Sequence, residues 1–360
     1  MPIETLQDTI LQGDSIALLK QIPSDTIDLI FADPPYNMQT EGELLRTDGS
    51  SFNGVTDKWD KFNSLGDYDS FTHSWLSECR RVLKDDGAIW VIGSFQNIFR
   101  LGYIMQDLGF WILNDVIWSK PNAVPNFGGT RFQNSHETLI WCSKRKGAKY
   151  QFNYKTMKYL NGDKQMKSVW DISICIGAER LKDKDGKKIH STQKPEQLLY
   201  NVILSSTQKG DLILDPFFGT GTTGAVAKRL GRHYIGIERE ELYIKAAKKR
   251  INNVQLELSD IIDNTLDVKP PRISIKQLVE MGYLYVGQYL FSKDKSHYAV
   301  IAFDGKVEYN GCITSIHKMS AAFLGRSNNN GWDYFWCEYN GGFVSIDSLR
   351  YLAKEKGGDK

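Results

Sequence analysis

The stretch DLIFADPPYN, residues 28–37, decides the fold of this chain. Its apolar run, residues 29–32, reads as a buried strand, and the strand ends in the carboxylate of Asp33. Two prolines follow at once, and proline fixes φ and lacks a backbone donor, so the strand ends there. The sequence therefore places a carboxylate and an aromatic ring, Tyr36, in a stiff turn at the end of a buried strand.

Similar short apolar runs recur along the first 255 residues and alternate with segments of helical spacing. Continuous apolar character is typical of strands that are covered on both faces. Alternating strands and helices predict an α/β fold with a doubly wound, mostly parallel sheet. The expected strands are 28–33, 88–93, 138–143, 211–215 and 234–238, and the clearest expected helices are 69–83 and 241–251.

The 360 residues are enough for one large and one smaller domain, and the 41% hydrophobic content is enough for a packed core. A net charge of +2 neither requires nor excludes nucleic acid, although basic clusters occur at 144–149 and 182–188. The five cysteines form no CxxC pair, no Cys/His spacing suggests zinc, and no apolar run reaches membrane length. We therefore expect a reduced cytoplasmic protein without a metal site.

Changes in composition predict the domain organisation. Residues 1–255 carry the α/β rhythm, which a polar and aromatic insertion interrupts at about 119–190. The proline-containing segment 256–272 reads as a linker. Residues 273–360 contain hairpin-like runs and an Asp-Gly turn, which predict a small β-rich domain. The polar, glycine-rich residues 39–63 are interpreted as a mobile loop that orders on substrate binding.

A glycine-rich turn, GTGTTG at 219–224, follows the strand that ends at Asp215. Glycines let the backbone approach a ligand, and Glu238, 19 residues after Gly219, can accept hydrogen bonds from ribose hydroxyls. The glycine-rich turn and Glu238 together predict a nucleoside-containing cofactor. The spacing also matches the dinucleotide fingerprint, but Phe217 and Phe218 before the turn suit an amino-acid tail better than two phosphates.

The Asp-Pro-Pro-Tyr turn suits the activation of a nucleobase amine as a nucleophile. The lone pair of such an amine is delocalised into the ring, and two acceptors facing its N–H bonds would localise it. The Asp33 carboxylate and the Pro34 carbonyl can act as these acceptors, and Tyr36 can stack on the base. A base held in this way must first leave the duplex.

Together these motifs make the chain resemble the DNA amino-methyltransferases that use S-adenosylmethionine. DPPY at 33–36 resembles their catalytic motif, and DPFFGTG at 215–221 resembles their cofactor motif. This order along the chain is that of the circularly permuted β class, with a Rossmann-like methyltransferase sheet. The segment 190–199 matches the one that this class carries just before the cofactor motif. The segments 128–144, 217–238 and 328–336 look closest to the adenine-N6 enzymes that modify GANTC, a subfamily that includes the cell-cycle-regulated methyltransferase and carries a C-terminal extension.

The resemblance implies roles for individual residues. The target-base site would consist of Asp33, Pro34, Pro35 and Tyr36. The cofactor site would consist of Asp14, Asp33, Gln193, Lys194, Asp215, Phe217, Gly219, Thr220, Gly221 and Glu238. The candidate DNA-binding residues are Leu44, Leu45 and Arg46 in the loop, Asn126 and Arg131 in the insertion, and Ser315, Asn330, Trp332 and Arg350 in the tail. The residue types also suit these tasks: Arg131 can read guanine, Trp332 can stack on an unpaired base, and Leu44 and Leu45 can act as apolar wedges.

We therefore expect a methyltransferase that acts on adenine N6 in double-stranded DNA, is associated with the bacterial nucleoid, and forms a homodimer, as members of the family often do. Three alternatives remain open at this point. Cytosine-N4 methylation is possible in the same pocket, because both targets are nucleobase amines, although an aspartate at position 33 favours adenine within the family. An NAD-dependent oxidoreductase would account for the glycine spacing. A DNA-binding module without catalysis would account for the tail.

Overall fold

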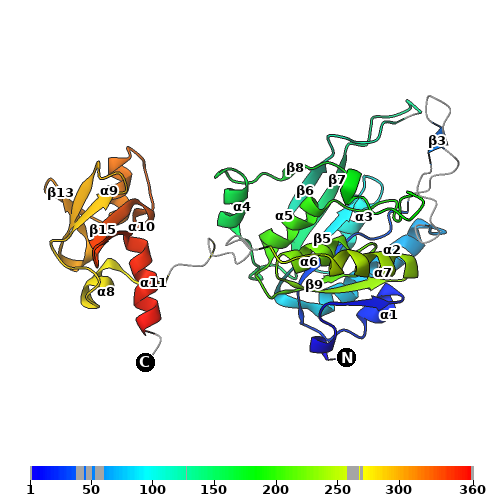
Figure 1. The fold of residues 1–360 in the computed structure, drawn as a ribbon, viewed down its shortest axis with the longest axis horizontal. Helices are drawn as coiled ribbons and strands as arrows, with labels where there is room; N and C mark the ends of the chain where they lie inside the picture. The colour runs from blue at the N-terminus through cyan, green and yellow to red at the C-terminus, as the bar shows by residue number, and fades with distance from the viewer. Residues whose placement is uncertain are drawn as a thin grey trace. The chain divides into compact units, whose positions relative to one another are not determined.

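The structure is a computed structural model that describes residues 2–37, 44–45, 51–52, 61–126, 128–257, 267 and 271–357. The chain divides into two compact units, 1–267 and 268–360 (Figure 1). We describe each unit by itself. Across these described ranges, no helix has the length and apolar character needed to cross a bilayer.

The described part of the first unit contains an eight-stranded sheet in the order β1-β10-β9-β2-β5-β7-β6-β8. The strands are β1 (Thr9–Gln12), β2 (Ile27–Ala32), β5 (Leu83–Gly93), β6 (Trp111–Ser119), β7 (His136–Ser143), β8 (Val169–Asp171), β9 (Leu212–Asp215) and β10 (His233–Glu238). Strand β7 is antiparallel to both of its neighbours, and the other pairs are parallel. The sheet is therefore mixed but mostly parallel.

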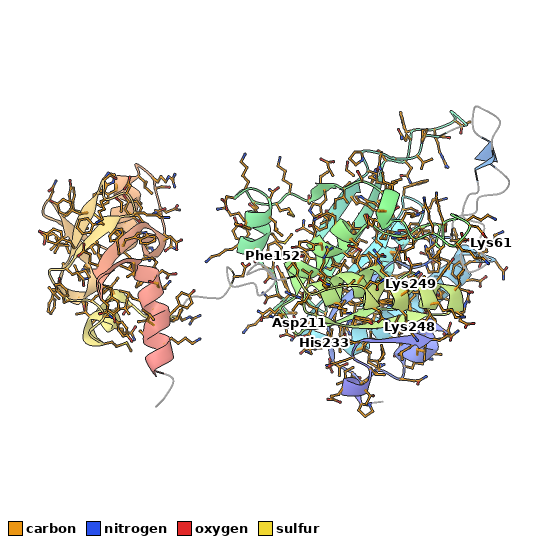
Figure 2. All side chains as sticks on the ribbon, in the orientation of Figure 1. Lys61, Phe152, Asp211, His233, Lys248 and Lys249 are labelled. Atoms are coloured by element: carbon orange, nitrogen blue, oxygen red, sulfur yellow. The ribbon has the colours of Figure 1, made fainter. Side chains whose placement is uncertain are left out.

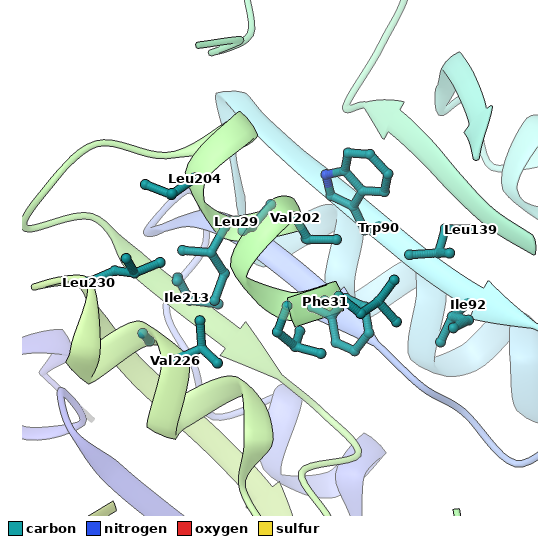
Figure 3. Close-up of a cluster of buried hydrophobic side chains, with 14 of the residues drawn as sticks. Leu29, Phe31, Trp90, Ile92, Leu139, Val202, Leu204, Ile213, Val226 and Leu230 are labelled. Carbon is teal, nitrogen blue, oxygen red and sulfur yellow. The ribbon is translucent and has the colours of Figure 1, made fainter. Parts of the chain in front are cut away.

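Helices cover both faces of this sheet. One face packs on α1 (Ser15–Leu19), α2 (Leu65–Val82) and α3 (Ile98–Asp107), and the other on α4 (Tyr154–Leu160), α5 (Glu196–Ser206), α6 (Thr222–Arg229) and α7 (Glu241–Asn252). Successive side chains of a strand point to opposite faces. Leu29 and Phe31 therefore join the α5–α6 core (Figure 3), and Ile30 and Ala32 join the α2–α3 core. This double burial explains the continuous apolar run of β2.

The parallel strands bring three acidic residues to one edge of the sheet. Strand β9 ends at Asp215 and β10 at Glu238, while Asp33 directly follows β2. These three strands are adjacent in the sheet. In Figure 2, Asp211 and His233 mark the opposite edge, where β9 and β10 begin, and Lys61 marks the edge at which they end.

The expected α/β sheet and its five predicted strands are present, with small changes in their bounds. Sequence analysis missed β1, β6 and β8, whose polar residues do not form a continuous apolar run. Strands β7 and β8 and helix α4 come from the 119–190 segment. In the 39–63 stretch, Leu44–Leu45 (β3) pairs with Ser51–Phe52 (β4). Residues 61–63 are also described, the rest of the stretch lies outside the described residues, and its mobility stays a prediction.

The second unit is β-rich, as expected. Its described residues contain a six-stranded antiparallel sheet in the order β14-β13-β12-β11-β15-β16 and four helices. The strands are β11 (Tyr289–Ser292), β12 (Tyr298–Ile301), β13 (Val307–Tyr309), β14 (Cys312–Thr314), β15 (Phe335–Tyr339) and β16 (Gly342–Ser345), and the helices are α8 (Ile275–Glu280), α9 (Ile316–Phe323), α10 (Gly331–Tyr334) and α11 (Ile346–Gly357). The Asp304-Gly305 turn has the positive φ angles, 61° and 72°, that this dipeptide accepts.

Candidate active site

A cavity of about 430 Å³ opens at the edge of the sheet where β2, β9 and β10 end. Residues of both sequence motifs line it, and so do Asp14 after β1 and Lys194 before α5. Its lining includes Asp33, Pro34, Pro35, Tyr36, Asp215, Phe217, Gly219, Thr220 and Glu238. The fold therefore joins two motifs that lie about 180 residues apart into one site.

The glycine turn forms one wall of this cavity. Gly219 and Gly221 have φ angles of 51° and 76°, a conformation that favours glycine. A Cβ atom on Gly221 would lie 2.7 Å from the Cβ of Ala247, so this position excludes any side chain. Gly221 is also the N-cap of α6, whose first N–H groups point toward the same edge.

Glu238 is held rigidly at the tip of β10. Its Oε2 accepts the Gly219 N–H at 2.7 Å, and its Oε1 accepts the N–H groups of Arg239 and Glu240, each at 2.8 Å. Burial raises the pKa of Glu238 in spite of these bonds. A carboxylate oxygen has two acceptor positions, so Glu238 retains capacity for ligand hydroxyls.

Asp215 and Asp14 stabilise the turns around the cavity. Asp215 accepts the Phe217 N–H at 2.9 Å and the Thr223 hydroxyl at 2.5 Å. Burial raises the pKa of Asp215 to about 7. Asp14 caps α1 by accepting the N–H of Ala17 at 2.9 Å. Both acids therefore fix the backbone around the cavity that they line.

The carboxylate of Asp33 is engaged at both oxygens. Oδ2 lies 2.7 Å from Lys194 Nζ, and Oδ1 lies 2.9 Å from the Tyr36 hydroxyl. The Pro35 carbonyl accepts the hydroxyl of Tyr68 at 3.1 Å, which anchors the turn to α2. Lys194 Nζ also lies 5.1 Å from the centre of the Tyr36 ring. The acid, the ring and the ammonium group thus form one compact unit.

Two charged residues that the sequence did not single out, Glu137 and Lys120, belong to this side-chain cluster. Glu137, at the start of β7, places Oε2 2.9 Å from the Tyr36 hydroxyl and Oε1 2.5 Å from Lys120 Nζ. Lys194 Nζ lies 3.8 Å from the same Glu137 Oε2. The only sequence signal was a glutamate next to the apolar run 138–143, and its partner Tyr36 is 101 residues away.

Burial and neighbouring charges set the ionisation of this cluster. Burial raises the pKa of Asp33, while Lys194 opposes the shift. Burial alone would also raise the pKa of Glu137, but Lys194 and Lys120 outweigh it and hold that pKa below its ordinary value. Burial would lower the pKa of Lys194, but the attraction of Asp33 and Glu137 raises it. Two carboxylates and two ammonium groups therefore balance in charge.

Gln193 and His190, from the segment before α5, both line the cavity. The Gln193 amide donates to the Glu179 carbonyl at 2.8 Å and accepts the Leu181 N–H at 3.0 Å, so both of its ends hold the preceding segment. His190, to which we assigned no role, lines the cavity and packs against Tyr243 with ring centres 4.6 Å apart. The cofactor role of Gln193 stays a prediction.

The candidate DNA-binding residues of the insertion lie in one turn. The Asn126 side chain donates to the Arg131 carbonyl at 2.9 Å and accepts the Gly128 N–H. The exposed Arg131 guanidinium lies 5.7 Å from the Phe95 ring, just beyond the end of β5. Arg131 therefore lies on the same sheet edge as Asp33, where a nucleic acid could reach it.

The four tail candidates have structural contacts in the second unit. Ser315 caps α9 and Asn330 caps α10. Trp332 is only 9% exposed, and the buried Arg350 guanidinium covers its ring at 4.1 Å. Arg350 is also paired with Asp347. These contacts account for the four residues by folding alone, so their role in DNA binding stays a prediction.

The loop candidates are described only in part. Leu44 and Leu45 form the short strand β3, and Arg46 lies outside the described residues. The role of all three as a DNA wedge is therefore untested.

An open α/β sheet with acidic strand ends and a glycine turn around one cavity defines an enzyme that uses a nucleoside-type cofactor. Comparison with known families narrows this class. The family described as DNA methylase, N6_N4_Mtase, matches residues 27–249, which is more than half of the chain. The chain belongs to this family and is a DNA methyltransferase.

Individual relatives agree with this assignment. The Type II methyltransferase M.HinfI of Haemophilus influenzae is 61% identical over 349 residues, which cover 97% of each chain. The Type II methyltransferase M2.LlaDCHI of Lactococcus lactis subsp. cremoris is 43% identical over 244 residues, which cover 68% of this chain and 88% of the relative.

Solved structures support the fold. The M1.HpyAVI–SAM complex has 26% identity and a TM-score of 0.50, and the match covers 68% of this chain and 98% of that one. The cytosine-N4-specific PvuII DNA methyltransferase has 23% identity and a TM-score of 0.53, with 72% and 93% covered. The matched structures confirm the α/β methyltransferase sheet. Membership of the DNA methylase family argues against the NAD-dependent alternative.

Proposed function

We propose that this chain transfers a methyl group from S-adenosylmethionine to N6 of adenine within GANTC sites of duplex DNA. The single observation that carries the proposal is the position of Asp33 in the cavity that Glu238 and the glycine turn also line. A target amine and a nucleoside-type methyl donor would meet there. The high identity to a Type II methyltransferase over nearly the whole chain supports a site-specific enzyme.

The residues of the cavity fit S-adenosylmethionine. Glu238 holds the ribose hydroxyls, and the glycine turn allows the close approach of the methionine end, beside Phe217. The buried Lys194 supplies a cation for a carboxylate. The cofactor supplies a methyl group that is bound to a positively charged sulfur. This sulfur is an excellent leaving group because it departs as a neutral thioether. The protein therefore needs no covalent intermediate, and its task is orientation.

The turn at 33–36 acts on the amine. The flipped adenine lies against Tyr36, with its N6 hydrogens donated to the Asp33 carboxylate and the Pro34 carbonyl. When bound, the cofactor would supply the methyl group: the N6–CH₃ bond would form as the S–CH₃ bond breaks, a neutral thioether would leave, and the proton that N6 loses would pass to solvent. The carboxylate stabilises the positive charge that develops on N6.

Incubation of the purified chain with labelled S-adenosylmethionine and paired duplexes tests this proposal. We expect N6-methyladenine in a GANTC duplex and none in a duplex with the site scrambled, as measured by mass spectrometry of the nucleosides. N4-methylcytosine would instead support the cytosine alternative. Asp33→Ala should abolish transfer and largely retain cofactor affinity. Tighter binding of NAD than of S-adenosylmethionine would contradict the proposal.

The remaining features belong to the same proposal. The order of the motifs supports a circularly permuted chain, and the unit 268–360 and the insertion take part in DNA binding. A homodimer rests on the resemblance, and light scattering of the full chain tests it. The five free cysteines among the described residues are consistent with a cytoplasmic, nucleoid-associated enzyme.

A further inference from the structure

A chain of polar contacts runs behind the cavity, from Lys120 through Glu137, Tyr36 and Asp33 to Lys194. The cavity is lined by Asp33, Tyr36 and Lys194, and Glu137 reaches it through the Tyr36 hydroxyl. The side chains of Glu137 and Lys120 are only 12% and 11% exposed. The buried Lys120–Glu137 ion pair therefore contacts the cavity through the Tyr36 hydroxyl.

The geometry contains a conflict over one proton. The Tyr36 hydroxyl lies 2.9 Å from Asp33 Oδ1 and 2.9 Å from Glu137 Oε2, but a phenol has a single O–H donor. Only one carboxylate can accept it at a time. When the hydroxyl points to Asp33, both Asp33 oxygens have internal partners, because Lys194 is bonded to Oδ2. In that state each Asp33 oxygen keeps one acceptor position, and the Tyr36 proton reduces the negative charge that Oδ1 offers to an incoming amine.

We propose that Glu137 is a positioning residue that draws the Tyr36 hydroxyl away from Asp33 and so frees Asp33 Oδ1 for the N–H of the target base. The switch needs only rotation about the Tyr36 C–O bond, because both acceptors already lie within hydrogen-bond distance. This inference rests on the proposed function, since it assigns a partner to the amine that Asp33 receives.

Lys120 keeps Glu137 able to accept this proton. Among the described residues, the groups that face the Glu137 carboxylate are Lys120, Lys194, Tyr36 and, beyond the hydroxyl, Asp33. The two ammonium groups favour its ionised form and lower its pKa. A protonated Glu137 could donate to the hydroxyl and would turn the hydroxyl proton toward Asp33.

Glu137→Gln is a sharp probe because it keeps the shape of the side chain. In this variant the amide oxygen faces Lys120, which offers the shorter and charged contact, so the NH₂ group faces Tyr36. That NH₂ donates to the phenol oxygen and forces the hydroxyl proton toward Asp33. We expect the single-turnover methylation rate to fall about tenfold, the scale of one hydrogen bond, with unchanged affinity for S-adenosylmethionine by calorimetry.

Tyr36→Phe supplies the decisive comparison, because it removes the competing hydroxyl. In that background we expect Glu137→Gln to change the rate by less than about twofold, so the two substitutions are strongly coupled. Equal effects of Glu137→Gln in both backgrounds, or a wild-type rate for the single variant, would overturn the inference.

Two further variants keep the test decisive. In the double variant Lys120→Met with Glu137→Gln, no lysine holds the amide oxygen, so this oxygen can turn to Tyr36. We expect the double variant to methylate DNA faster than Glu137→Gln alone. This comparison decides the matter if Tyr36→Phe is too slow to measure.

Asp28→Asn is the matched control. Asp28 lies on β2 away from the cavity and pairs with Lys84 at 2.6 Å, so its substitution should leave the rate per folded molecule unchanged. A wild-type chain that forms no methylated base would contradict the proposed function itself.

Discussion

Lys194 Nζ lies 2.7 Å from Asp33 Oδ2, although 161 residues separate them along the chain. The contact joins the segment before α5 to the turn after β2, and the two side chains are 7% and 17% exposed. A buried carboxylate stays ionised only if a partner offsets its desolvation. The pair therefore controls whether Asp33 can act as an acceptor.

Lys194→Met should make Asp33 harder to ionise. Burial already raises the pKa of Asp33, and Lys194 is the main group that opposes this shift. Without it the pKa rises further, so the acidic limb of the pH–rate profile should move to higher pH. At pH 7 we expect methylation to fall at least about 100-fold. A uniformly lower profile with an unmoved acidic limb would show that the lysine acts in some other way.

Asp215→Asn should change the pH dependence of stability. The Asp215 pKa is about 7 in the folded chain and near 3.8 in the unfolded one. Protonation of Asp215 in the folded chain stabilises the fold. This contribution to the free energy of unfolding is fully present below about pH 4 and is lost as the pH rises through about 7. Asparagine stays neutral, so from pH 5 to pH 8 its unfolding free energy should gain about 1–3 kcal/mol relative to wild type. Urea unfolding at both pH values measures this, and a constant difference would contradict the raised pKa.

Gly221→Ala should destabilise the chain and weaken cofactor binding. A Cβ at this position meets Ala247 at 2.7 Å, and the backbone has a φ of 76°. We expect a loss of about 1–3 kcal/mol in the free energy of unfolding. Gly147→Ala is the matched control, since its φ is 74° but no atom lies within 4 Å of the added Cβ. If both variants lose the same amount, backbone strain alone, without the clash, accounts for the effect.

Trp332→Ala should unfold the second unit before it affects DNA contacts directly. Trp332 packs in the core with Phe335 and under the Arg350 guanidinium. Truncation should cost about 3–5 kcal/mol in that unit and leave S-adenosylmethionine binding unchanged. Trp332→Phe keeps a ring and should retain most of the fold, while Phe303→Ala, at a site 85% exposed, is the neutral control. Wild-type unfolding of Trp332→Ala with lost DNA binding would favour a base-stacking role instead.

Local sequence patterns were sufficient for the central strands and for the cavity. The apolar run of β2, the acid after it and the acids that end β9 and β10 could be read directly, because parallel strands bring their carboxyl ends to one edge. Strands β6 and β8 were missed because their sequences mix polar and apolar residues, and pairing with neighbours made them strands. The direction of β7 also depended on its pairing with β5 and β6.

The sequence by itself determined the α/β fold, the β-rich second unit, and the place of Asp33 and Glu238 at the ends of buried strands, because these depend on residue type and on spacing along the chain. Only the tertiary structure revealed Glu137 beside Tyr36, the pairing of Lys120 with Glu137 and the pairing of Lys194 with Asp33. It also gave Trp332 and Arg350 a packing role. The physical reason is that burial and long-range contacts set the charge and the partner of a side chain, and neither is contained in its neighbours along the sequence.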